Sequence, residues 1–343
     1  MSFLNKLNNW KTYVVVVLTI SQGYAQQAGS RVFSFLELPS SAFQAGVGNV
    51  SATYQGHNPS MMLANPASLS MNEGKWASIS TSFLPASTNM SSLYYTQNIK
   101  KVGQLGVSFR YISFGKIQGY DASGQRTRQF TPSAFSLAIT HARKFGHFVI
   151  GSTVDVIHST IDAYGATGLL LNLGGMFVHP TMDLTVGAVV KNVGFILSDF
   201  SETSNSSVPA ELQVGASIKP EHMPVRFTLT LQRLNQWNLQ SPQEKINEPN
   251  QGLDNAFRHV VIGSEIILSR HVHALFSYNH LRRKELKIEE KRGFSGFAIG
   301  FLASIWSYDL TYSFSGYHVS GNVNTITLTG NLSDITFKKK TNG

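Results

Sequence analysis

Large apolar side chains occupy every second position along most of the chain, with small or polar side chains between them. Residues 105–112 show the pattern well. One face carries Leu105, Val107, Phe109 and Tyr111, and the other carries Gly106, Ser108, Arg110 and Ile112. A period of two predicts β-strands, and runs of about ten residues suit a tilted strand that crosses a bilayer.

The same alternation recurs up to residue 328. Its segments are 76–83, 89–99, 105–112, 135–139, 148–156, 169–177, 184–190, 212–218, 225–231, 257–268, 272–278, 297–301, 306–314 and 326–328. They predict about fourteen strands, and an even number is what a bacterial single-chain membrane barrel has.

The connections between these segments are expected to alternate between short and long. Short ones fall at 100–101, 144–146, 179–182, 219–222, 269–270 and 303–304; long ones cover roughly 115–131, 159–166, 194–208, 235–256, 282–293 and 315–321. Short periplasmic turns against long outer loops are typical of outer-membrane barrels. We therefore predict an all-β fold, a membrane-spanning antiparallel β-barrel; the alternative is a secreted, soluble all-β protein.

The composition agrees with a surface that faces lipid. Only 14% of the residues are charged, whereas soluble domains average about 25%. The chain has no run of eighteen apolar residues that would form a transmembrane helix. Membrane insertion would therefore depend on the strands.

The N-terminus has the features of a secretory signal peptide over residues 1–25. Lys6 and Lys11 precede the short apolar run 13–20, and Gly23 and Ala25 suit the −3 and −1 positions of a cleavage site. We expect cleavage after Ala25. The alternatives are a membrane anchor or a buried strand.

Charge and cysteine content exclude several classes of function. Loss of Lys6 and Lys11 lowers the formal charge from +9 to +7, and the remaining basic residues are scattered, so no nucleic-acid partner is expected. The absence of cysteine excludes disulfides, thiolate metal sites and a lipid-modified cysteine anchor.

Residues 26–74 break the alternation and precede the barrel, which we place at 75–337, with a basic tail at 338–343. Asn-Pro pairs at Asn58 and Asn65 divide the segment into short helical or turn pieces. A barrel of about fourteen strands would be an open channel unless something filled it. We predict that this segment is a plug; the alternative is a periplasmic tail.

This segment resembles the N-terminal hatch of the FadL-like barrels of Bacteroidetes. The resemblance is carried by Phe35-Leu36-x-Leu38-Pro39-x-Ser41-Ala42, by Gly46-x-Gly48 and by Asn65-Pro66-Ala67. It implies that Phe35, Leu36, Pro39, Gly46, Gly48, Asn65 and Pro66 form the hatch. Residues 181–187 with 191–194, 209–215, and 224–227 leading to 235–237 are similar to the PorQ group of that family.

The resemblance implies a non-catalytic role in the type IX secretion system. Such a barrel would anchor a PorZ-like surface protein, in an attachment complex with PorU-like and PorV-like proteins that fixes exported proteins to the cell surface. The sequence departs from the pattern at Phe43, where Arg is frequent, and at Gly46-Val47-Gly48, which replaces a Gly-Gly pair. It also continues beyond Phe337, where barrels commonly end on an aromatic residue.

The sequence does not predict an enzyme, a metal site or a cofactor. The best cluster for catalysis is Asp155, His158, Ser159 and Asp162, but the strand pattern turns Asp155 inward and His158 outward, whereas a hydrolase needs them together. His271 and His273 share one strand face without a third ligand of suitable spacing.

The rival hypothesis is a FadL-like outer-membrane transporter of hydrophobic molecules. Met61, Met62 and Leu63 could line its apolar pocket, and a continuous inner path would favour transport, whereas a sealed lumen would favour anchoring.

On the anchoring hypothesis, outer-loop aromatics are the natural partner contacts. These are Tyr120, Phe130 and Trp237. The mixed charges of 282–292 indicate a solvated loop that could contact outer-membrane lipid or lipopolysaccharide.

Overall fold

The computed structural model describes residues 31–71, 74–201, 203–204, 206–240, 252–286, 294–318 and 321–333. The expected signal peptide (1–25) and basic tail (338–343) lie outside these residues. Within them, no helix is long and apolar enough to cross a membrane.

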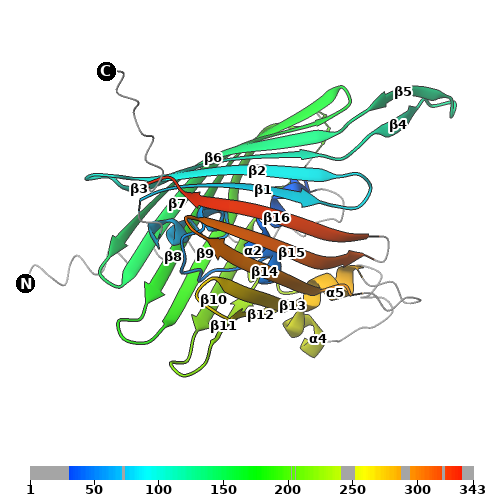
Figure 1. Cartoon of the computed structure of the whole chain (residues 1–343). Helices are drawn as coiled ribbons and strands as arrows, with labels where there is room; N and C mark the ends of the chain where they lie inside the picture. Colours follow the sequence, from blue (N-terminus) through cyan, green and yellow to red (C-terminus); the bar gives the residue numbers. More distant parts are fainter. Residues whose placement is uncertain are drawn as a thin grey trace, which may run out of the picture.

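Fourteen antiparallel strands form a closed barrel, which confirms the predicted fold (Figure 1). The strands are β1 (Lys75–Phe83), β2 (Asn89–Ile99), β3 (Gly103–Ser113), β6 (Ser133–Phe145), β7 (Phe148–Ile161), β8 (Tyr164–Val178), β9 (Leu184–Ser198), β10 (Glu211–Ile218), β11 (Val225–Leu231), β12 (Val260–Ile267), β13 (Val272–Asn279), β14 (Phe297–Ile305), β15 (Tyr308–His318) and β16 (Gly321–Asn331). β1 pairs with β16 from Trp76↔Asn331 to Phe83↔Asn324, which closes the barrel.

The two faces of the wall follow the sequence alternation. On β3, Val107 and Phe109 point outward and are 43% and 39% exposed, while Ser108 and Arg110 point inward and are almost fully buried. The outer surface therefore presents an apolar band to lipid, and the inner surface is lined largely by small and polar side chains.

The expected alternation of short and long connections is only partly correct. β7 and β8 are joined by residues 162–163 alone, not by a loop over 159–166. Asp162 has φ +54, as two-residue hairpin turns require, and the strands on both sides continue with polar residues beyond the apolar band. The expected loop was therefore strand.

Three other connections also differ from expectation. The turn predicted at 303–304 lies at Trp306 and Ser307, between β14 and β15. The strand predicted over 257–268 begins only at Val260, because helix α4 (Gly252–Arg258) occupies the preceding residues. The loop after β3 contains an additional hairpin of β4 (Ile117–Tyr120) and β5 (Arg126–Phe130), which projects beyond the barrel (Figure 1).

The long loops gather at one end of the barrel, together with the hairpin, α4, α5 (His280–Leu286) and the two-residue β7–β8 turn, and the connections at the other end are all short (Figure 1). In outer-membrane barrels the long loops face the exterior and the short turns face the periplasm. We use "outer end" and "periplasmic end" in this sense.

Candidate functional site

Residues 31–71, which we call the lumenal segment, pack against the inner wall of the barrel. The segment forms η1 (Ser34–Glu37), α2 (Ala42–Gly46), η2 (Pro59–Leu63) and η3 (Pro66–Met71). Contacts of α2 with β13–β16 and of η3 with β6–β8 place it across the barrel from one side of the wall to the other.

Side-chain caps explain why these short helices begin where they do. The Ser41 hydroxyl accepts a hydrogen bond from the backbone N–H of Gln44 at the start of α2. At the start of η2, Asn58 Oδ1 accepts from Ser60 N–H, and Pro59 occupies the first helical position. Both arrangements satisfy backbone donors that a helix leaves free at its N-terminus.

The first of the expected hatch residues lie in an apolar cluster towards the outer end. Phe35 and Leu36 are buried there, and Pro39 is buried as well. Their cluster includes the inward-facing wall residues Met90, Ile112, Ile157 and Leu170. The inner wall is therefore apolar at the place where Phe35 packs against it.

Gly46 and Gly48 lie where the segment closely approaches the wall. A Cβ atom on Gly46 would come within 2.7 Å of Leu275 Cδ1. Gly48 has φ +97, and a Cβ there would come within 2.5 Å of Val261 Cγ1. At Gly48 a larger residue would therefore be strained by both its backbone and its surroundings.

Asn65 and Pro66 lie directly against two glycines of the wall, Gly174 and Gly151. A Cβ on Gly174 would overlap Asn65 Oδ1, and a Cβ on Gly151 would lie 2.4 Å from the Pro66 carbonyl carbon. Asn65 Nδ2 donates to the carbonyl of Ala52 at 2.6 Å, and its Oδ1 accepts from Ala67 N–H. The side chain of Asn65 thereby joins two turns of the segment.

Met61, Met62 and Leu63 do not line an open pocket in this conformation. Met61 packs with Phe43 and Leu275, and the other two pack with Tyr94 on β2. All three are buried. The expectation that they face an apolar ligand site is therefore not met in the closed arrangement.

An ion pair crosses the inner face of β6. Arg110 on β3 and Asp155 on β7 lie 2.9 Å apart, and the Ser136 hydroxyl between them donates to Asp155 and accepts from Arg110. Both charged side chains are almost fully buried. The Arg110 guanidinium also lies 5.7 Å from the centre of the Phe35 ring, so the pair supports the lumenal segment.

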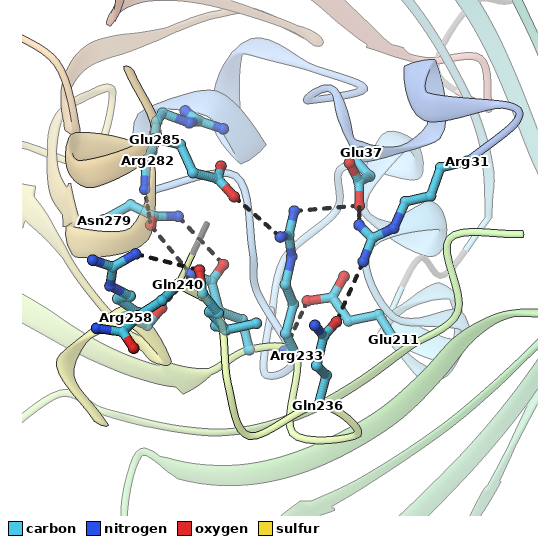
Figure 2. Close-up of polar contacts among 12 residues, drawn as sticks. Arg31, Glu37, Glu211, Arg233, Gln236, Gln240, Arg258, Asn279, Arg282 and Glu285 are labelled. Atoms are coloured by element: carbon cyan, nitrogen blue, oxygen red, sulfur yellow. Dashed lines mark hydrogen bonds and ion pairs between the residues drawn. The ribbon is translucent and has the colours of Figure 1, made fainter. Parts of the chain in front are cut away.

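A second set of charges joins the lumenal segment to the outer loops (Figure 2). Arg233, in the loop after β11, contacts Glu37 of η1 at 3.3 Å and Glu285 of α5 at 3.2 Å. Arg31 contacts the same Glu37 oxygen at 3.2 Å. We call Arg233, Glu37 and Glu285 the outer latch.

The outer latch borders a small polar cavity of about 130 Å³. Its lining includes Lys191, Glu211, Gln213 and Asn49. The amide of Gln213 is buried and makes no hydrogen bond to any described residue. A polar cavity of this size suits ordered water, which would satisfy the amide.

The electrostatics of the outer latch favour a charged arginine. Burial alone would lower the pKa of Arg233, but the nearby Glu37, Glu285 and Glu211 outweigh burial and raise it above its ordinary value. Arg233 therefore stays protonated at any physiological pH.

The expected partner residues lie on the outer loops. Tyr120 on β4 is 59% exposed, Phe130 on β5 is partly buried, and Trp237 is 68% exposed. The Trp237 ring stacks on His259, with 5.4 Å between ring centroids.

The structure separates the residues that the sequence grouped as a catalytic cluster. Asp155 and Ser159 point inward, and His158 lies outward beside the Phe135 ring. Asp162, in the turn after β7, pairs with Arg128. These groups do not converge on one substrate atom.

His273 bonds to Glu265 at 2.7 Å. Within the described residues no group of three His, Asp or Glu side chains could hold a metal ion.

Comparison with known proteins identifies the fold. The toluene transporter TbuX of Ralstonia pickettii is 13% identical, with a TM-score of 0.53 over 88% of this chain and 100% of that one. A mutant of the monoaromatic hydrocarbon channel TodX is 11% identical, with a TM-score of 0.53 over 87% of this chain and 98% of that one. No protein-family model and no curated protein matches the sequence.

These observations define the class of protein. The closed fourteen-stranded barrel, its apolar outer band and its likeness to these barrels make the chain an integral protein of the bacterial outer membrane. Of these two similar structures, TbuX is described as a transporter and TodX as a channel.

Proposed function

We propose that this chain is an outer-membrane channel for small hydrophobic molecules, closed by a lumenal segment that must shift to let them pass. The observation that carries the proposal is the fold shared with a toluene transporter and a hydrocarbon channel along almost the whole chain. The expected hatch residues have the role of a plug in this proposal.

The chemistry of the inner wall supports a passage behind the plug. Hydroxyls on several strands are buried yet form no hydrogen bond to the described residues. They belong to Thr96, Ser108, Thr185, Thr230, Ser313 and Ser315. Buried hydroxyls in proteins normally have partners, so these groups would gain them from water or a passing ligand once the lumenal segment moves away.

The attachment of the plug supports movement from the outer end. Apolar clusters and a few hydrogen bonds, such as that from Ala42 N–H to Thr327 Oγ1, hold it to the wall, whereas the outer latch joins it to two separate loops by charge. Ion pairs at a partly exposed site contribute little stability each. Loss of the latch would therefore loosen the plug without unfolding the barrel.

The experiment that tests the proposal measures uptake of radiolabelled toluene by cells that lack their own hydrocarbon channels. Cells producing this chain should take up toluene faster than cells producing an unrelated barrel at the same level. Equal uptake, with the protein shown to be folded in the outer membrane, would overturn the proposal.

A second candidate is the attachment role implied by the resemblance to the PorQ group. Burial of nearly all of the lumenal segment favours it, because an anchor has no need of an open lumen. In that role the outer loops would hold a PorZ-like surface protein, with PorU-like and PorV-like proteins in the same complex.

Mild detergent extraction from the outer membrane tests this second role. The anchor predicts that a large surface protein is recovered with the barrel in fixed proportion. A barrel recovered alone would contradict it.

A further inference from the structure

A dent interrupts the apolar outer band near the periplasmic end. Its floor is formed by the small outward residues Ser152, Gly175 and Ala188, and Ile150 and Leu173 stand beside it. Pairing of Ile150 with Gly175, and of Gly175 with Ala188, places these residues in one row across β7, β8 and β9. The dent has a volume of about 690 Å³, within the range of about 300–1,000 Å³ typical of small-molecule sites.

An unpaired arginine stands at the edge of this dent. Arg143 pairs across the ladder with Ile150, so it begins the same row. Its guanidinium lies 5.4 Å from the centre of the Phe145 ring, and it forms no ion pair with a carboxylate of the described residues. Arg226, on the inner face of β11, by contrast has both of its terminal nitrogens on Asp183 at 2.8 Å.

A charge on the lipid-facing surface needs an anion or water close by. Arg143 is the second residue before the aromatic row of Phe145, Phe148 and Phe177, which marks the periplasmic interface. A long arginine side chain can reach from that position to the level of the lipid headgroups. The membrane itself offers phosphate there.

We propose that the dent and Arg143 form a binding site for one glycerophospholipid of the inner leaflet. Arg143 contacts the phosphate, and one acyl chain lies over Gly175 and Ala188 between Ile150 and Leu173. The guanidinium suits this ligand because it binds phosphate through paired N–H donors. The site is separate from the lumen, so the inference does not depend on the proposed transport.

Single substitutions can fill the dent or remove the charge of Arg143 without disturbing the barrel. A Cβ on Gly175 would meet nothing closer than Val149 O at 3.8 Å, so Gly175→Leu fills the dent from the outer side. Arg143→Gln removes the charge. Matched controls are Ser264→Leu, on the outer face of β12, and Arg270→Gln, in an exposed periplasmic turn.

Native mass spectrometry of the full chain, titrated in detergent with phosphatidylglycerol or with diacylglycerol of the same acyl chains, tests the proposal. The unaltered chain should bind one phosphatidylglycerol about tenfold more tightly than diacylglycerol. Arg143→Gln should bind both equally, Gly175→Leu should weaken both, and the controls should behave as the unaltered chain. Heat-modifiable migration on gels verifies that each variant is folded.

Two results would overturn the proposal. One is phosphatidylglycerol binding that Arg143→Gln and Gly175→Leu leave unchanged. The other is displacement of phosphatidylglycerol by lipopolysaccharide at equal concentration, because that lipid belongs to the opposite leaflet.

Discussion

Arg110 and Asp155 meet across the inner face of β6, with 2.9 Å between Nη2 and Oδ2, although 45 residues separate them in the sequence. Each is almost fully buried, and the Ser136 hydroxyl bonds to both. The pair therefore lies behind the plug, at the point where Phe35 reaches the wall.

Removal of one member of this pair should destabilise the barrel strongly. Asp155→Ala leaves the Arg110 guanidinium buried without its carboxylate, which typically costs about 3–5 kcal/mol. The measurement is unfolding in urea, followed by tryptophan fluorescence. Arg128→Ala breaks the more exposed pair with Asp162 and should change the free energy of unfolding by about 0–1 kcal/mol. Equal losses for both variants would contradict this assignment.

If the barrel is a channel as proposed, loss of the outer latch should make it leak. Arg233→Gln removes the charge that joins Glu37 to Glu285, so the plug should leave its closed position more frequently. Single-channel recording in planar bilayers should show brief openings several times more frequent than in the unaltered chain.

Arg126→Gln, which alters an exposed arginine on the projecting hairpin, provides the matched control and should leave the record unchanged. The same opening frequency in Arg233→Gln and in the control would show that the latch does not hold the plug.

The junction between α4 and α5 should resist mild acid. Asp254 accepts from His280, Lys284 and Arg258; burial would raise its pKa, but these hydrogen bonds outweigh burial and lower it well below its usual value. A depressed folded-state pKa stabilises the fold above the unfolded value of about 3.9, and this contribution is lost as the pH falls through the folded value.

Hydrogen exchange of the α5 amides tests this junction. Exchange, corrected for its intrinsic pH dependence, should be as slow at pH 5 as at pH 7, and Asp254→Asn should accelerate it at both. Exchange in the unaltered chain that speeds up between pH 7 and pH 5 would contradict the expected titration.

A substitution of Trp237 tests the attachment role without disturbing the fold. Its backbone carbonyl accepts from Asn255 and contacts His259 Nε2, but its ring is largely exposed. Trp237→Ala keeps the backbone contacts, so the barrel should remain folded while a surface partner is lost from detergent extracts. Undiminished recovery of such a partner would remove Trp237 from the interface.

Much of the barrel could be predicted from the sequence because, within the apolar band, large apolar residues on the outer face alternate with mostly small or polar residues on the inner face. That rule fails beyond the apolar band: the polar residues His158, Ser159 and Thr160 indicated a loop, yet they continue β7. Outside the membrane, water replaces lipid on the outer face, and the contrast between faces disappears.

The candidate site was predictable only in part. Arg110 and Asp155 were both assigned to the inner face by the alternation, so their meeting could have been anticipated. Arg233 and Glu37 lie in irregular segments without a period, and their contact depends on how the loops fold over the plug. Prediction of the dent would have required the pairing register of β7, β8 and β9, which cannot be read from the sequence.

A disulfide that locks the plug to the wall tests most directly whether the barrel opens by movement of its plug. A Cβ on Gly215 of β10 would lie 3.2 Å from Ala52 Cβ, and the Cβ atoms of a disulfide lie about 3.5–4.5 Å apart. A small shift would therefore allow a disulfide in the double variant Ala52→Cys with Gly215→Cys. The chain has no other cysteine that could compete. We predict that oxidation stops toluene uptake by this double variant, that a reducing agent restores it, and that neither single variant responds. Uptake that continues at full rate with the disulfide formed would contradict a channel that opens by movement of its plug.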